Sequence, residues 1–71
     1  MEIDVEKIQA ELQELAGEEV VKVKIDKHLE SAVSIRQTDR KPHYLIKLNP
    51  LRIRSPHTLE GHIQFCREAV C

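Results

Sequence analysis

Apolar residues recur with a helical period at both ends of this chain and with a strand period in its middle. A repeat of three to four residues is typical of one helix face, whereas strict alternation is typical of a strand with one buried side. The pattern therefore predicts helix, strand, strand, strand and helix in that order. These apolar faces can all be buried together if both helices pack on one face of a single sheet. We expect a two-layer α+β sandwich, order α-β-β-β-α.

The first helix is predicted over residues 5–16. Asp4 precedes it and is a good N-cap, because its carboxylate can accept a hydrogen bond from the first turn. Gly17 follows it, where a helix often ends in a residue with positive φ. The apolar stripe consists of Val5, Ile8, Leu12, Leu15 and Ala16.

Three short segments alternate apolar and polar residues, at positions 20–25, 32–37 and 43–48. Their short connections favour an antiparallel three-stranded meander. The side chains expected to face the helices are Val21, Val23, Ile25, Val33, Ile35, Tyr44, Ile46 and Leu48. The opposite face of the sheet would then carry Lys22, Lys24, Arg36 and Lys47.

The closing helix is predicted to begin at Pro56. A serine N-cap followed by proline at the first helical position, as at Ser55, is a strong start signal. The residues expected to form its buried stripe are Leu59, Ile63, Cys66 and Val70.

Asn49 and Pro50 end the last strand and begin the connection to that helix. Leu51 and Ile53 then alternate with arginines. This alternation predicts either a short edge segment or a loop held down by two apolar side chains.

The chain has 71 residues and only two aromatic side chains, Tyr44 and Phe65. This length predicts one domain, residues 1–71, near the lower limit for a core that is stable alone. The core must be built from Val, Ile and Leu. It leaves little free energy for strained catalytic geometry.

No apolar run approaches the length that spans a bilayer. The N-terminus is acidic and lacks the apolar segment of a signal peptide. We therefore expect a cytoplasmic protein with no membrane partner, whose Cys66 and Cys71 are reduced. Cys71 could cross-link chains under oxidation. Both a monomer and a homodimer remain open.

Charge is unevenly distributed along the chain. Residues 1–19 contain seven acids and one lysine, whereas residues 20–58 contain nine lysines or arginines and three acids. One interpretation is internal complementarity between solvated surfaces. The other is a basic sheet face that meets an anionic partner.

The stretch from Ile46 to Cys66 resembles a known family. A strand reading Ile46-Lys47-Leu48-Asn49-Pro50 leads into a proline-started helix, as in small zincin-like metallopeptidases of the SprT-like and minigluzincin type. In that family the helix carries His-Glu-x-x-His, and the matching segment here is residues 62–66. The resemblance implies a zincin-like α+β core.

This segment departs from the family motif at two positions. His62 matches the first histidine, but Ile63 replaces the glutamate that serves as general base, and Cys66 replaces the second histidine. A catalytic zinc requires three protein ligands and an open position. The resemblance therefore implies a shell without peptidase activity or a fragment of a longer protein.

Three candidate sites follow from the residues. A metal site, which zinc would suit, would use His62 and Cys66, with His57, Glu60 or Cys71 as a third donor. Against it, a cysteine in an apolar stripe is usually a small buried hydrophobe. A nucleophilic role for Cys66 with His62 as base meets the same objection, because burial raises a thiol pKa.

The third candidate is an anion-binding or nucleic-acid-binding surface on the basic sheet face. Phosphate contacts require only such charges, whereas base stacking requires exposed aromatic side chains, which this face lacks. Its residues are Lys22, Lys24, Arg36 and Lys47, with Arg52 and Arg54 at the rim.

These observations predict a small non-catalytic domain without a cofactor, acting as a protein-interaction module for an unidentified protein partner. The first alternative is a nucleic-acid-binding module that uses the basic face. The second is a fragment of a zinc-dependent hydrolase in which His62 and Cys66 are completed by ligands from elsewhere.

Overall fold

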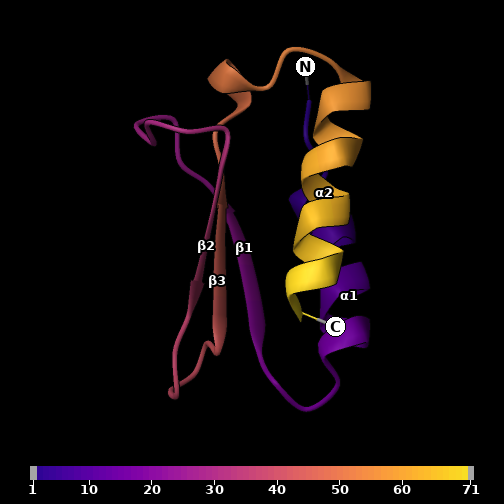
Figure 1. Ribbon diagram of the computed structural model, residues 1–71, viewed down its shortest axis with the longest axis vertical. Helices are drawn as coiled ribbons and strands as arrows, with labels where there is room; N and C mark the ends of the chain where they lie inside the picture. The colour runs from indigo at the N-terminus through magenta and orange to yellow at the C-terminus, as the bar shows by residue number, and fades with distance from the viewer. Residues whose placement is uncertain (1, 71) are drawn as a thin grey trace.

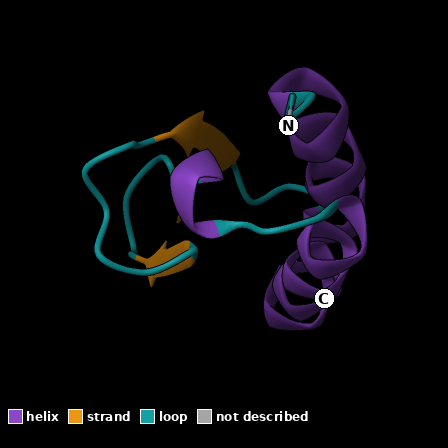
Figure 2. Ribbon diagram, turned by 90° about the horizontal axis from the view of Figure 1, so that it is seen from above, coloured by secondary structure: helices purple, strands orange, loops and turns teal. Residues whose placement is uncertain are grey.

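The computed structural model describes residues 2–70, which form two helices packed on one face of a three-stranded sheet (Figures 1 and 2). The two-layer α+β arrangement and the order α-β-β-β-α are therefore confirmed. The elements are α1 (Val5–Ala16), β1 (Val21–Ile25), β2 (Val33–Gln37), β3 (Tyr44–Leu48), the 3-10 turn η1 (Pro50–Arg52) and α2 (Pro56–Val70).

The sheet is mixed, so the expected antiparallel meander is wrong. The strand order is β1-β3-β2, with β1 parallel to β3 and β2 antiparallel to β3. Val23 and Ile35 both lie opposite Ile46, on either side of the central strand. Only the β2–β3 pair is a hairpin, and β2 serves as the return segment between two parallel strands.

The central position of β3 follows from its composition. Tyr44, Ile46 and Leu48 are buried, and Leu45 on the other face is half-buried. A strand with apolar residues on both faces is stabilised more by two strand neighbours than by one. The meander would have placed the more polar β2 at the centre instead.

The crossover from β1 to β2 passes the end of β3 and is held there by Asn49. This side chain is only 2% exposed. Its amide nitrogen donates to the carbonyl oxygens of Leu29 at 2.6 Å and Lys27 at 3.4 Å. Its oxygen accepts from the Leu51 N–H at 3.0 Å. One amide thus joins the crossover, the end of β3 and η1.

Both helices begin with the predicted caps. The Lys7 N–H donates to the Asp4 carboxylate at 3.1 Å, and the Thr58 N–H donates to Ser55 Oγ at 3.1 Å. Gly17 ends α1 with φ of 68°. Its N–H donates to the Gln13 carbonyl, so a positive φ is used there as expected.

The core consists of the predicted stripes brought together between sheet and helices. Cys66 and Val70 are buried in it, whereas Leu15 and Ile25 lie at its margin and are exposed. Among residues 2–70 there is no helix long and apolar enough to cross a membrane. The connection at η1 is a loop with one buried apolar side chain, Ile53, instead of the expected two, because Leu51 is 74% exposed.

Replacing Asn49 with alanine is expected to lower the free energy of unfolding by about 2–4 kcal/mol, because buried carbonyl groups and an N–H lose their partner. Urea denaturation followed by circular dichroism measures this. Glu68→Ala, at an exposed position on α2, should change stability by less than about 0.5 kcal/mol. Equal effects of the two substitutions would contradict the role given to Asn49.

Candidate functional site

Cys66 lies in the hydrophobic core. Its side chain is 1% exposed and is surrounded by the buried stripes of α1, α2 and the sheet. Burial raises the pKa of the Cys66 thiol to about 11, because the thiolate would lose its hydration. At neutral pH the thiol is therefore protonated, which disfavours both nucleophilic attack and metal binding.

The other proposed metal ligands do not gather around that sulfur. His62 is half-buried beside Cys66 on α2, and His57 is exposed in the first turn of the helix. Glu60 is engaged by Arg67 Nη1 at 2.6 Å. Within residues 2–70, no group of three or more His, Cys, Asp or Glu side chains could hold a metal ion. Cys71 lies outside the described residues.

The predicted basic residues form a regular grid on the outward face of the sheet. In the first row Leu45 lies between Lys22 and Arg36; in the second, Lys47 lies between Lys24 and Ser34. Neighbouring strands are about 4.8 Å apart, and alternate residues of one strand are about 6.6 Å apart. Four cations therefore share one face of the sheet. We call this grid of Lys22, Lys24, Arg36 and Lys47 the basic face.

An ion pair joins the basic face to Asp26. Asp26 follows β1, and its carboxylate lies 3.9 Å from Lys47 Nζ. Among the described residues, this is the one ion pair that includes a cation of the basic face. Arg52 and Arg54 are exposed but lie on η1 and on the connection to α2, beyond the end of β3. They are not part of the grid.

Opposite charges lie on opposite sides of the two layers. The N-terminal segment and α1 carry five of the twelve acids against one lysine, and Glu2, Asp4, Glu6 and Glu14 are exposed on the helical layer. The uneven charge along the chain therefore becomes a separation across the fold. The helical layer is acidic, whereas the outer sheet surface is basic.

The outer edge of β1 is closed by two glutamines of α1. The backbone groups of the even-numbered residues of β1 bond to β3, so the N–H groups of Val21 and Val23 point away from the sheet. The Val21 N–H donates to Gln13 Oε1 and the Val23 N–H to Gln9 Oε1, both at 2.9 Å. Side chains that occupy these groups stop another strand from pairing there.

The outer edge of β2 is open by comparison. The Asn49 N–H donates to the Ala32 carbonyl, and the Thr38 N–H donates to the His43 carbonyl. The backbone groups of the even-numbered residues of β2 therefore bond to β3. Val33, Ile35 and Gln37 therefore direct their backbone groups outward. Ser31 Oγ donates to the Val33 carbonyl at 2.9 Å. Within residues 2–70, no other hydrogen bond reaches these outward groups.

Apolar side chains flank this open edge. Val33 and Ile35 face the helical layer but are only half-buried. α1 packs on β1, and Arg67 of α2 pairs with Glu11 of α1. The side of α2 that carries Arg67 therefore faces α1, and the other side of α2 lies nearer to β2. At 100° per residue, His62 lies on that other side, whereas Phe65 lies beyond it and points toward solvent. Phe65 is 57% exposed.

An ion cluster ties α2 to α1. Arg67 Nε donates to Glu11 at 2.5 Å, and Arg67 Nη1 donates to Glu60 at 2.6 Å and to Gln64 at 2.9 Å. The hydrogen bonds to Glu11 and then Glu60 raise the pKa of Arg67 above its usual value. This cluster has a structural role at the helix–helix contact.

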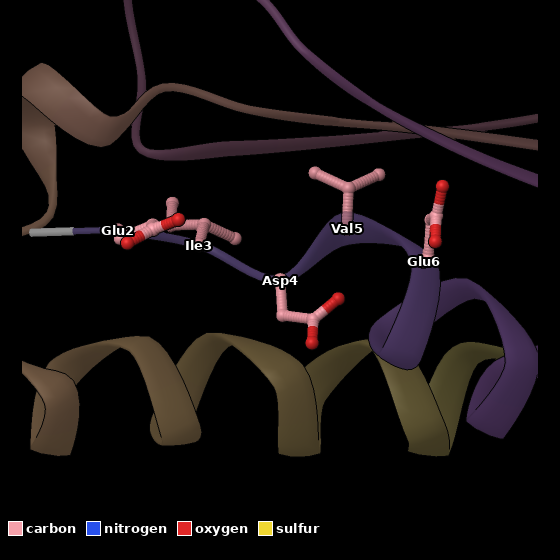
Figure 3. A pocket seen from close by; sticks show the side chains of 5 residues that line it. All are labelled: Glu2, Ile3, Asp4, Val5 and Glu6. Atoms are coloured by element: carbon pink, nitrogen blue, oxygen red, sulfur yellow. The ribbon is translucent and has the colours of Figure 1, made fainter.

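A shallow hollow beside the start of α1 is lined by residues 2–6 (Figure 3). Asp4 projects toward α2, while Val5 projects toward the sheet (Figure 3). The Asp4 carboxylate already accepts the capping bond from Lys7. The hollow is therefore explained by the local structure of the helix start.

Comparisons with protein-family models, with curated proteins and with solved structures found no match. The zincin-like resemblance therefore rests on residues 45–66 and on the order of the elements.

Sequence analysis did not identify the residues that make the two sheet edges different. Gln9 and Gln13 lie one helical turn apart beside the apolar stripe, and this spacing is the signal that could have found them. His43 was likewise missed, although its Nδ1 accepts from the Val20 N–H at 2.9 Å. Neither contact is expected unless β1 is the neighbour of both α1 and β3.

The buried thiol of Cys66 should make stability depend on pH above neutrality. Burial raises the pKa of the thiol from 9.0 in the exposed state to about 11 in the folded state. Between these two pH values the unfolded state progressively loses its proton while the folded state keeps it, so stability falls as pH rises. We expect this group to contribute a loss of about 1–2 kcal/mol between pH 8 and pH 10.

The measurement is urea denaturation across that pH range for the wild type and Cys66→Ala. The difference between the two isolates Cys66, because every other titrating group is common to both. Parallel pH profiles for the two proteins would contradict a protonated, buried thiol.

Proposed function

We propose that this chain is a non-catalytic protein-interaction module that accepts an extended segment of a partner protein as an additional strand along β2. The observation that carries the proposal is the difference between the two sheet edges. The outward N–H groups of Val21 and Val23 are occupied by glutamines, whereas those of Ile35 and Gln37 are free within the described structure. Strand addition uses such unpaired edges.

The backbone of β2 supplies affinity without regard to the partner's sequence. Its outward groups recur at every second residue, about 6.6 Å apart, which matches the repeat of an added strand. Ser31 occupies one outward carbonyl, so the strongest pairing is expected around Ile35. The added strand would extend the sheet to four strands and give β2 a neighbour on both sides.

The side chains beside β2 define the partner's chemistry. On the helix side, the half-buried Val33 and Ile35 offer apolar contacts. On the other side, Arg36 projects from the basic face. A segment with β-branched residues alternating with acids would place its apolar residues against α2 and its carboxylates beside Arg36.

Two features favour a non-catalytic role over peptide hydrolysis. Ile63 lies where the zincin motif has its general base, and isoleucine cannot accept a proton. The thiol of Cys66, in place of the second histidine, is buried with a pKa of about 11. The proposal therefore retains the zincin-like shell as a scaffold for binding.

A synthetic peptide that alternates valine with glutamate tests the proposal. Titration followed by amide NMR should shift the resonances of Val33, Ile35 and Gln37 and slow the hydrogen exchange of their N–H groups. Val21 and Val23 should be unaffected, because their N–H groups are already bonded. A peptide of the same composition in scrambled order is the control for non-specific charge attraction.

Ile35→Pro is the matching variant. It deletes an outward N–H without removing a bond to β3, and proline is tolerated on an edge strand in that orientation. We expect it to weaken peptide binding at least tenfold, whereas Ile35→Val should bind like the wild type. Unchanged binding by a folded Ile35→Pro protein, or shifts confined to the basic face, would contradict edge pairing.

A further inference from the structure

We infer that the basic face binds the phosphodiester backbone of nucleic acid without sequence preference. This site lies on the outward surface of the sheet and shares one residue, Arg36, with the β2 edge. It consists of Lys22, Lys24, Arg36 and Lys47. The inference does not depend on the interaction proposed for β2.

The first argument is the arrangement of like charges. Lys24 and Lys47 are directly opposite in the register of β1 and β3. Like charges placed opposite each other on one sheet face are destabilising. Asp26 reaches only Lys47, at 3.9 Å. An anion above the grid would neutralise both lysines and relieve this repulsion.

The second argument is that the four residues of the basic face are regularly spaced along the backbone. Neighbouring strands are about 4.8 Å apart, and alternate residues of one strand are about 6.6 Å apart. A nucleic acid strand presents one phosphate about every 3.4 Å of duplex axis. Because this phosphate repeat is the same for every base sequence, several phosphates can contact the basic face whatever the sequence of the nucleic acid.

The third argument is the chemistry between the cations. Leu45 occupies the middle of the first row, and together with Val20 and Pro42 it forms an apolar floor bordered by Lys22, Lys24 and Lys41. Such a floor accommodates sugar carbons while the ammonium groups reach phosphates. The described residues of this surface include no aromatic side chain that could stack on bases. Binding is therefore expected to be independent of the base sequence.

The acidic helical layer orients the complex. The N-terminal segment and the two helices carry seven of the twelve carboxylates against Lys7 and Arg67, and the helices pack on the face of the sheet opposite the basic face (Figure 1), so an approaching polyanion is repelled there and attracted to the sheet. This separation also explains how a chain with a net charge of −1 can bind a polyanion. Only the local field at the sheet needs to be positive.

Fluorescence anisotropy with labelled random-sequence duplex DNA and single-stranded DNA, at about 50 mM salt, tests the inference. Both probes should bind with little dependence on sequence. Neutralising about four phosphates predicts a slope near −3 to −4 when the logarithm of the duplex binding constant is plotted against that of salt concentration. No anisotropy change at the lowest salt would overturn the inference.

Two double variants with the same net charge locate the site. Lys24→Glu/Lys47→Glu reverses the charge at the centre of the basic face and should weaken DNA binding more than tenfold. Lys7→Glu/Lys27→Glu makes the same change at exposed positions outside the grid and should weaken it less than threefold. Circular dichroism confirms that both fold. Equal losses would show that only net charge matters and would overturn the site.

Two competitors test the identity of the partner. Poly-glutamate and anionic phospholipid vesicles are compared with DNA at equal concentrations of negative charge. The inference predicts that DNA competes best, because its sugar carbons can also contact the apolar floor formed by Val20, Pro42 and Leu45. Stronger competition by poly-glutamate would assign the face to an acidic protein, and stronger competition by vesicles would assign it to a lipid surface. Either result overturns nucleic-acid binding.

Discussion

The buried amide of Asn49 holds the junction on which the sheet topology depends. It donates to two carbonyls of the β1–β2 crossover and accepts from the N–H that begins η1. The crossover must stay over the end of β3 for β1 and β2 to lie on opposite sides of that strand. All three polar contacts are made in a site closed to water, so removing any of them leaves a costly unpaired group.

That topology decides which surfaces are available. With β3 at the centre, β1 comes to lie beneath α1, where Gln9 and Gln13 close its edge. β2 becomes the other edge, without a comparable cover from the helices. The same order aligns the cations of all three strands into rows. The proposed partner strand and the proposed nucleic acid would therefore use two neighbouring surfaces, an edge and a face.

Comparison of expectation and structure separates local from long-range information. The limits of α1, its caps and the proline start of α2 were predicted correctly, because hydrophobic period and capping chemistry act within a few residues. The outward position of the lysines followed from strand parity. The strand order was wrong, since a connection the length of residues 26–32 is compatible with both a hairpin and a crossover.

The candidate sites show the same division. Sequence alone established the α-β-β-β-α order, the apolar stripe containing Cys66 and the alternation that exposes Lys22 and Lys24, because each depends on side chains a few positions apart. Only the tertiary structure decided that β1 and β3 are parallel, that Gln9 and Gln13 close one edge, and that Lys24 lies opposite Lys47. These features depend on pairing between distant segments, which is selected by the burial of the whole core and has no local signal.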